Sequence, residues 1–458
     1  MNDDIIKNRV GKTPLVRAKK LEQELNIGNI YLKLEGNNPS KRKTDRLAYM
    51  IIKDALELNM KVICLGMACD LAKSLAFLCE YYNLECVFVF PQKNRWLKYR
   101  EFQKDYIELI EYGKNEMESI EYCNQLSKEK GYYNANLGIE NNILNMASLS
   151  AISEELAIQI KKPIDSIFVQ MGYGFSISGM YLGFRKLWMN DEISKMPSLY
   201  SCTVEEGNII YDKYKETSGY LKEYKPVKKT KYNKYVRIAE SKMMENVLDA
   251  VIDTNGTIIG IEEDELISFV KYFKNLEKIK LSIENAYALA GFIKKAKEGS
   301  LKYGNHVILL NDGHIDLEVK TIEEVEGIHI IKLIELLDNW LMEYTDPLEE
   351  IREAVNNAIK NGHVLLALLD NRIVGITVIV NTGFETFIPT YHLAYIATDK
   401  KAKGRGVATQ LIQKAIDLTG GNISLHVGRD NKNAVKLYEK MGFKKSYLRM
   451  IHQGWKNL

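Results

Sequence analysis

Asn431-Lys-Asn-Ala-Val-Lys-Leu-Tyr-Glu-Lys-Met-Gly-Phe443 is the stretch that decides the fold of the last third of the chain. Its apolar residues recur at helical spacing and a glycine follows, so the run predicts a helix over Asn433–Met441. Four β-rich runs precede it, with Asp370-Asn371 as a tight turn between the first two. These runs predict strands at Val364–Leu369, Ile373–Val380, Tyr391–Ala397 and Ile423–Val427.

A glycine-rich loop, Lys403-Gly-Arg-Gly-Val-Ala408, lies between a predicted strand and an amphipathic helix. The buried stripe of that helix comprises Val407, Ala408, Leu411, Ile412, Ala415 and Ile416. Gly404 and Gly406 let the backbone approach a ligand closely, and Arg405 can face solvent. The free N–H groups of a first helical turn favour an anion, so the loop suits a pyrophosphate. A plain helix-entry turn would have the same pattern.

Taken together, these two motifs resemble the GNAT acetyltransferase superfamily. The superfamily's Gln/Arg-x-x-Gly-x-Gly/Ala loop is matched by Lys403, Gly406 and Ala408, with lysine as the departure at the first position. The later Asn-x-x-Ala-x-x-Leu-Tyr-x-x-x-Gly-Phe pattern is matched at every fixed position. The resemblance implies an α/β fold with a mixed sheet and an acetyl-CoA cosubstrate.

The resemblance also assigns roles to single residues. Tyr438 would protonate the departing CoA thiolate, although an aromatic residue on an apolar helix face is also typical of a core. The expected cofactor-binding residues are Ile396, Lys403, Gly404, Arg405, Gly406, Val407, Ala408 and Asn431. Backbone N–H groups at the end of the strand over 393–397 would polarise the thioester carbonyl. The general base stays open among Glu385, His392 and Asp399.

Before residue 317, short β-rich runs alternate with longer helical patterns, which predicts a mostly parallel sheet covered on both faces. Val10-Gly-Lys-Thr-Pro-Leu-Val-Arg17 and Tyr31-Leu-Lys-Leu-Glu-Gly-Asn-Asn-Pro-Ser40 resemble motifs of fold-type-II pyridoxal-phosphate enzymes such as threonine synthase. The resemblance implies a two-subdomain α/β/α sandwich and a homodimer. We expect this domain over 1–317 and the acetyltransferase domain over 327–458, with an exposed acidic segment between them.

Three departures argue against the chemistry of that family. The family's Lys-Asp-Arg places the imine-forming lysine at Thr44, and neighbouring Lys43 would point about 100° away on a helix. The loop that holds the substrate carboxylate falls near Met67-Ala-Cys-Asp70, with an acid at its end. The phosphate cup contains Gly172, Gly174 and Ser176 but also two aromatic residues. We therefore expect a vestigial site that does not hold pyridoxal phosphate through a lysine.

Composition excludes several classes of function. The 458 residues carry a formal net charge of only +3, which gives no reason to expect a nucleic-acid partner, and the Lys- and Tyr-rich segment 212–237 predicts a solvated surface. No apolar run reaches the roughly 20 residues that span a membrane. The start of the chain lacks a signal-peptide pattern, so we expect a cytoplasmic protein with reduced thiols and no metal. The six cysteines are Cys64, Cys69, Cys79, Cys86, Cys123 and Cys202.

The leading hypothesis is an N-acetyltransferase that modifies a primary amine, an amino acid or a derivative. A degenerate first domain would bind the acceptor or form a dimer. One alternative is a bifunctional enzyme in which Lys43 or another lysine holds pyridoxal phosphate. A second alternative is a non-catalytic protein that senses ligands or directs assembly. The acyl specificity, the acceptor and the coupling between domains do not follow from the sequence.

Overall fold

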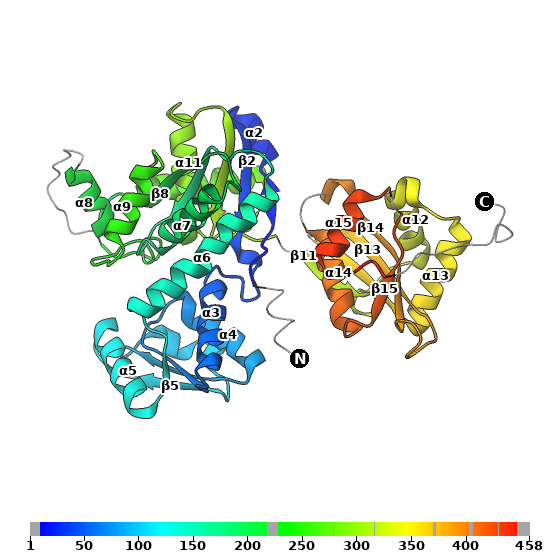
Figure 1. The fold of residues 1–458 in the computed structure, drawn as a ribbon, viewed down its shortest axis with the longest axis horizontal. Helices are drawn as coiled ribbons and strands as arrows, with labels where there is room; N and C mark the ends of the chain where they lie inside the picture. The colour runs from blue at the N-terminus through cyan, green and yellow to red at the C-terminus, as the bar shows by residue number, and fades with distance from the viewer. Residues whose placement is uncertain are drawn as a thin grey trace. The chain divides into compact units, whose positions relative to one another are not determined.

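The computed structural model describes residues 10–217, 228–277, 279–315, 317–369, 372–402, 406–428 and 430–446. The chain divides into two compact units, Met1–Ile315 and Asp316–Leu458 (Figure 1). None of the helices in the described ranges is long and apolar enough to cross a membrane. The Asp370-Asn371 turn and residues Lys403, Gly404 and Arg405 lie outside the described residues.

The first unit contains two sheets, each the centre of one subdomain. A six-stranded sheet has the order β1-β2-β10-β7-β8-β9, and a four-stranded sheet has the order β5-β4-β3-β6. Among the described strands of these two sheets, only β1 runs antiparallel to its neighbour. The strands are β1 Leu15–Arg17, β2 Gly28–Leu34, β3 Val62–Leu65, β4 Glu85–Phe90, β5 Ile107–Glu111, β6 Tyr133–Asn134, β7 Ser166–Gln170, β8 Ser198–Val204, β9 Thr257–Ile261 and β10 Gly304–Leu310.

Helices cover these sheets because their apolar stripes need a partner. The α-helices of the first unit are α2 Lys19–Leu25, α3 Asp45–Glu57, α4 Asp70–Tyr82, α5 Glu116–Lys130, α6 Ile139–Gln159, α7 Phe175–Met189, α8 Ile209–Thr217, α9 Met244–Asp253, α10 Glu263–Glu277 and α11 Tyr287–Lys297. In Figure 1, α6 lies along the border between the two sheets and contacts both α3 and α7. The α/β fold with two subdomains agrees with the sequence-based expectation.

The second unit is built on a five-stranded mixed sheet with the order β11-β12-β13-β14-β15. Its strands are β11 Leu317–Thr321, β12 His363–Leu369, β13 Arg372–Asn381, β14 Tyr391–Thr398 and β15 Ile423–Leu425. Helices α12 Ile330–Leu341 and α13 Leu348–Asn361 cover one face, and α14 Val407–Leu418 and α15 Lys432–Lys440 cover the other. The β13–β14 pair is antiparallel and the β14–β15 pair is parallel.

The acidic segment after Ile315 is part of the second unit. Strand β11 pairs with β12 from Leu317↔Leu369 to Thr321↔Leu365, and Leu317 and Val319 pack on the core beneath α14. Its alternating pattern places glutamate and lysine on one side and apolar residues on the other. The second unit thus begins before Gly327. Its first strand is a half-apolar edge strand that lies within the acidic segment.

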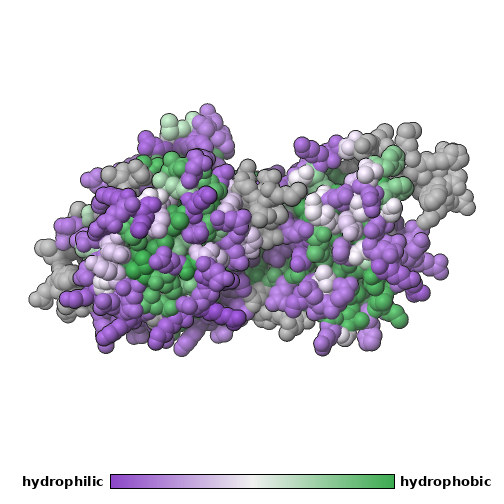
Figure 2. Space-filling model, turned by 90° about the horizontal axis from the view of Figure 1, so that it is seen from below, coloured by the Kyte–Doolittle hydropathy of each residue, from purple (hydrophilic) through white to green (hydrophobic). Residues whose placement is uncertain are grey.

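Large apolar side chains stand exposed on neighbouring helices of the first unit. They are Ile143 and Ile158 on α6, Leu182, Trp188 and Met189 on α7, and Ile252 on α9. Figure 2 shows apolar side chains gathered within hydrophilic surroundings on the visible face. All six cysteines are free, and five of them are buried.

Candidate active sites

Helix α14 begins at the predicted pyrophosphate loop. Gly406 precedes it with a φ of 76°, a left-handed conformation that favours glycine, and its carbonyl accepts from Gln410 N at 3.0 Å. Val407 packs into the core, so it could serve a ligand only through its backbone. A Cβ on Gly375 of β13 would lie 2.5 Å from Val407 Cγ1, so this glycine lets the helix start close to the sheet.

The strands β14 and β15 separate after three paired residues. Their register runs Tyr391↔Ile423, His392↔Ser424 and Leu393↔Leu425, after which β15 ends while β14 continues to Thr398. Within the described residues, the last five positions of β14 therefore have no strand partner on that side. Every second residue of an antiparallel strand turns its N–H and C=O away from its partner, so this edge offers free backbone groups.

A β-bulge lies at the point where the two strands separate. Val378 of β13 pairs with Tyr395, but Ile379 pairs with Leu393, so Ala394 is an extra residue on β14. A bulge leaves its extra residue out of the ladder and redirects the backbone there. Ala394 can therefore present its N–H to a ligand that enters beside β14. Ile396, one of the expected cofactor-binding residues, lies half-buried two positions further on.

Tyr438 lies on α15 with its ring packed in the core that α14 and α15 form over β14. It is 7% exposed, and its ring contacts Phe443 edge-on at a centroid distance of 5.9 Å. Burial raises the pKa of its hydroxyl to about 12. Asn431 caps the same helix, since its Oδ1 accepts from Ala434 N at 3.1 Å. Because Oδ1 is used in this bond, the Asn431 side chain would donate to a ligand through its amide nitrogen.

The structure separates the three candidate bases. Glu385 is exposed in the loop between β13 and β14. Asp399 Oδ1 accepts from Lys401 N at 2.8 Å, so this carboxylate stabilises the turn that follows β14. His392 lies on β14 two residues before the bulge, and its Nδ1 lies 2.9 Å from Ser424 Oγ on β15. Of the three, His392 alone is held beside the point where the strands separate.

Two further pairs of side chains in contact near β14 were not predicted from the sequence. The ring of His426 lies 4.5 Å from that of His392, centroid to centroid. On the face covered by α12 and α13, Tyr395 Oη donates to Asp346 Oδ2 at 2.7 Å. Both pairs depend on strand register and loop path, for which the sequence holds no local signal.

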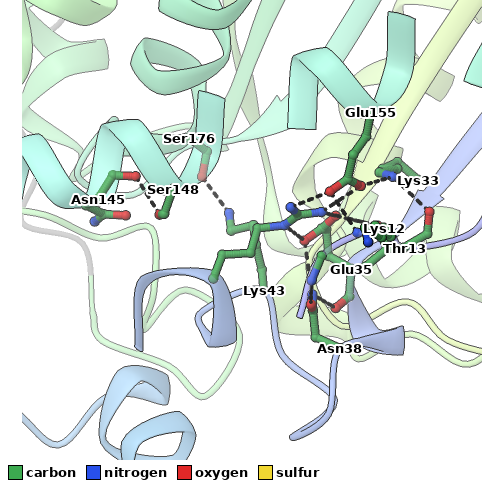
Figure 3. A network of polar contacts seen from close by, with 12 residues as sticks. Lys12, Thr13, Lys33, Glu35, Asn38, Lys43, Asn145, Ser148, Glu155 and Ser176 are labelled. Carbon is green, nitrogen blue, oxygen red and sulfur yellow. Dashed lines mark hydrogen bonds and ion pairs between the residues drawn. The ribbon is translucent and has the colours of Figure 1, made fainter. Parts of the chain in front are cut away.

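In the first unit, Lys43 lies in a turn that precedes α3, not within a helix. Its Nζ donates to Ser176 Oγ at 2.5 Å, as Figure 3 shows, and its backbone N donates to Asn311 O at 3.2 Å. Thr44 turns elsewhere, with its Oγ1 2.7 Å from Ser74 Oγ. The expectation that Lys43 points away from the site is wrong, because the helical rotation on which it rested does not apply to a turn.

The amine of Lys43 is enclosed by protein although the residue as a whole is partly exposed. Burial lowers its pKa to about 8, while Glu35 acts in the opposite direction. At pH 7 roughly a tenth of this amine is therefore uncharged.

A buried ion-pair network holds the residues on both sides of Lys43 (Figure 3). Arg46 Nε lies 2.7 Å from Glu35 Oε2, and its Nη1 lies 2.7 Å from Glu155 Oε1. Lys33 Nζ lies 2.6 Å from Glu155 Oε2. Burial works against ionisation of both acids, but the Arg46 guanidinium holds the pKa of Glu35 below its ordinary value and that of Glu155 at about 2. The network connects β2, α3 and α6.

The predicted phosphate cup lies at the start of α7. Gly174 precedes this helix with a φ of 100°, and a Cβ on Gly172 would lie 2.3 Å from Tyr235 O. Both positions therefore require glycine, and Ser176 lies in the first helical turn, where free N–H groups favour an anion. The rings of Tyr173 and Phe175 lie 6.4 Å apart and leave Ser176 in contact with Lys43.

The loop at 67–70 is acidic and already has partners. Asp70 Oδ1 accepts from Tyr235 Oη at 3.2 Å and lies 3.7 Å from Arg42 Nε. The carboxylate of Glu116 is hydrogen-bonded to the backbone of Ala68. Ala68 and Asp70 therefore already have partners, and the expected loss of donors in this loop stays a prediction. Among the described residues, no group of three or more potential ligands is arranged for a metal.

Comparisons with known proteins divide the chain at the same place. Residues 6–313 match the family described as pyridoxal-phosphate dependent enzyme, and residues 333–443 match the acetyltransferase (GNAT) family. The threonine synthase of Methanocaldococcus jannaschii is 24% identical over 306 residues, which cover 66% of this chain and 74% of that protein. The cysteate synthase of Methanosarcina barkeri is 21% identical over 315 residues, which cover 64% and 75%.

Solved structures show the same fold for the first unit. The processed form of threonine deaminase isoform 2 from Solanum lycopersicum has a TM-score of 0.54 at 16% identity. The match covers 76% of this chain and 85% of the deaminase chain. A hydrogen sulfide-producing enzyme from Fusobacterium nucleatum has a TM-score of 0.52 at 18% identity and covers 68% and 98%.

Pyridoxal phosphate needs an amine, an anion site and polar partners, and the first unit holds candidates for each. Lys43 supplies the amine, and Ser176 with the first turn of α7 supplies the anion site. Asn311, whose backbone contacts Lys43, has a buried Oδ1 without a hydrogen-bond partner. These residues fit the group, whereas the acidic loop at 67–70 does not add to the fit.

Proposed function

The chain belongs to the pyridoxal-phosphate dependent enzyme family through residues 6–313 and carries a GNAT-family domain at 333–443, and from this premise we propose that it is an acetyl-CoA-dependent N-acetyltransferase. The acceptor is a primary amine, either an amino acid or a derivative of one. The observation that carries the proposal is the separation of β14 from β15 at the Ala394 bulge, next to buried Tyr438.

The separated strands provide a place for the cosubstrate. An extended chain with amide groups can hydrogen-bond to the free edge of β14 as an added strand would. The backbone N–H groups at Gly406, Val407 and Ala408 suit the pyrophosphate, because they lie at the start of α14. Asn431 adds a side-chain donor from the start of α15. The expected roles of Lys403, Gly404 and Arg405 remain predictions.

The reaction needs three groups around the thioester. The acceptor nitrogen attacks the acetyl carbonyl carbon, and the negative charge that develops on oxygen is stabilised by the N–H of Ala394. The C–S bond then breaks, and Tyr438 donates its proton to the departing thiolate. His392 accepts the proton that the attacking amine loses, directly or through a water molecule. Ser424 orients the imidazole by its hydrogen bond to Nδ1.

Tyr438 suits the role of acid because its environment keeps the proton on oxygen. With a pKa of about 12, the hydroxyl stays protonated over the working range of most enzymes. A CoA thiolate is the conjugate base of an ordinary thiol. It is a stronger base than the Tyr438 phenolate only if the thiolate is desolvated. Burial of the site supports that condition.

The first unit also offers a surface for self-association. The exposed apolar residues Ile158, Leu182, Trp188 and Met189 on α6 and α7 support a homodimer formed through this unit. We expect the protein to act in the cytoplasm on a small molecule.

Calorimetry with acetyl-CoA and a thiol-release assay with a panel of amines test the acetyltransferase. We expect one acetyl-CoA site per chain and CoA release that requires an amine. Tyr303, which is 80% exposed on the first unit, provides a matched control for the tyrosine substitution. Y438F should lower turnover with little effect on acetyl-CoA affinity, and Y303F should change neither quantity. An equal loss of affinity and turnover in Y438F would assign Tyr438 to binding instead.

A further inference from the structure

Two thiols of the smaller subdomain face each other between a strand and the helix that covers it. Cys64 lies on β3 and Cys123 on α5, 59 residues further along the chain, and their sulfur atoms are 2.6 Å apart. We propose that this pair is a redox-sensitive modification site, at which a hydroperoxide converts the two thiols into a reversible disulfide between β3 and α5. The proposal concerns the first unit alone and does not rest on the acetyltransferase.

The two sulfur atoms are close enough to bond without a change of fold. A disulfide bond is about 2.05 Å long, so the sulfur atoms need to approach each other by only about 0.5 Å. Both cysteines are fully buried in a small apolar cluster with Val87 and Val89 of β4. Close packing around the pair leaves the side chains little freedom to turn apart.

The two thiols differ in acidity, which gives each one a role. A hydrogen bond from Cys64, joined by one from the Asn136 side chain, lowers the pKa of Cys123, although burial acts in the opposite direction. The same bond between the thiols, together with burial, raises the pKa of Cys64. Cys123 is therefore the thiolate that attacks the oxidant, and Cys64 is the thiol that closes the disulfide.

Asn136 is held in the orientation that this role requires. Its Oδ1 accepts from Gly66 N at 2.7 Å, and its Nδ2 donates to Asn124 Oδ1 at 2.9 Å. An amide nitrogen carries two protons, so the second proton of Nδ2 serves the sulfur of Cys123. Asn136 is buried, which strengthens these bonds by excluding water from them.

The reaction balances with a hydroperoxide as the only co-reactant. The Cys123 thiolate attacks one peroxide oxygen, the O–O bond breaks, and Cys123 becomes a sulfenic acid. The other oxygen takes up the proton that Cys123 released and leaves as an alcohol, or as water when the oxidant is hydrogen peroxide. The sulfur of Cys64 then attacks the sulfenic sulfur, the S–O bond breaks, and the hydroxyl group leaves as water with the Cys64 proton. The two thiols lose two electrons, and the O–O bond receives them.

Access to the pair is controlled by α5. This helix packs on β3, β4 and β6, and only four fully buried side chains form the cluster beneath it. A helix with so small a core opens locally at a lower free energy than the whole unit unfolds. Such an opening admits a molecule as small as hydrogen peroxide, and closure then brings the two sulfur atoms together.

The disulfide also restrains the loop at 67–70. The carboxylate of Glu116, the first residue of α5, is hydrogen-bonded to the backbone of Ala68. A Cβ on Gly66 would lie 2.6 Å from Ile120 Cα, so α5 packs directly on the segment that follows β3. A covalent bond between α5 and β3 keeps this contact closed, and oxidation therefore holds the loop in place.

Disulfide mapping of the full-length chain tests the proposal. The purified, reduced protein is treated with hydrogen peroxide, the remaining thiols are blocked, and tryptic peptides are analysed by mass spectrometry without reduction. We expect one dominant crosslink, between peptides 62–73 and 115–128, which a dithiol reductant reverses. Because the first peptide also contains Cys69, fragmentation must assign the bond to Cys64. Hydrogen exchange of the α5 amides should be at least about tenfold slower in the oxidised chain.

C69A provides the matched control, because Cys69 lies on the same peptide but is partly exposed. C69A should form the crosslink as the natural chain does, whereas C64A and C123A should each lose at least about tenfold of it. Circular dichroism melts of the reduced variants show whether each one folds. A natural chain that keeps both Cys64 and Cys123 as free thiols in excess peroxide, or whose dominant crosslink runs through Cys69, would overturn the proposal. Neither outcome bears on acetyl-CoA binding by the second unit.

Discussion

Lys43 and Ser176 lie 133 residues apart in sequence, yet their side-chain nitrogen and oxygen meet at 2.5 Å between the two subdomains of the first unit. The contact brings an amine of lowered pKa to the start of α7, where an anion would be stabilised. A polar pair of this kind costs folding free energy that an apolar pair would not cost.

The stability of the first unit should depend on pH through Lys43. Its pKa is about 8 in the folded chain and near 10.5 when unfolded, so the unfolded chain binds more protons between those values. The free energy of unfolding therefore rises with pH across that window. Below the window, the destabilisation caused by burying the charged Lys43 amine is constant. K43M should exceed the natural chain by about 1–3 kcal/mol at pH 7, with no such advantage above pH 10.5. Urea unfolding at several pH values measures the difference, and a pH-independent difference would contradict the lowered pKa.

Removing one member of the buried network should be far more costly than removing an exposed ion. Glu35 is fully buried against Arg46, so E35Q leaves the two cations Lys33 and Arg46 to share the Glu155 carboxylate and should cost about 3–5 kcal/mol. Glu154 forms an exposed pair with Lys186, and E154Q should cost less than about 1 kcal/mol. Thermal unfolding of both variants provides the comparison. Equal costs would show that the network does not stabilise the turn before α3.

Ionisation of Tyr438 should not lower turnover at any pH below about 11. Burial keeps its hydroxyl protonated, since the pKa is about 12. Y438F should lower kcat by about 10²-fold at every pH up to that limit. A pH–rate profile of the natural chain and of Y438F, each at saturating acetyl-CoA, measures this. A limb near pH 9 that vanishes in Y438F would mean a more acidic hydroxyl.

His392 should act as the base that Ser424 orients. H392Q should remove most of the turnover while leaving acetyl-CoA affinity unchanged, and S424A should lower kcat by a smaller factor, about 10-fold. E385Q serves as the control, because Glu385 lies in an exposed loop away from this pair. Stopped-flow single turnovers separate the chemical step from product release. Full activity in H392Q with loss in E385Q would transfer the role of base to Glu385.

Sequence patterns captured most of the regular elements and the two family resemblances. The strands predicted at Val364–Leu369 and Ile373–Val380 are runs of mostly apolar residues, and the structure has them as β12 and β13. The direction of Lys43 could not be predicted, because it depends on whether the turn or the helix continues at residue 44. The bulge at Ala394 and the pairing of His392 with Ser424 depend on register between strands, which no local pattern encodes.

The boundary between the two units shows a second limit of prediction from the sequence. Leu317 to Thr321 is rich in charge, and an edge strand of this kind looks like a linker until its alternation is paired with β12. Tertiary pairing, not propensity, decides its structure.

Transfer of an acetyl group by the whole chain is the most direct test of the proposed acetyltransferase. The measurement is amine-dependent release of CoA thiol from acetyl-CoA by the natural protein, with the acetylated amine identified by mass spectrometry. We predict saturable release with a KM for acetyl-CoA between about 1 μM and 1 mM, and strong loss in Y438F. A well-folded chain that neither binds acetyl-CoA at roughly 1 mM nor acetylates any amine of the panel would contradict the proposal.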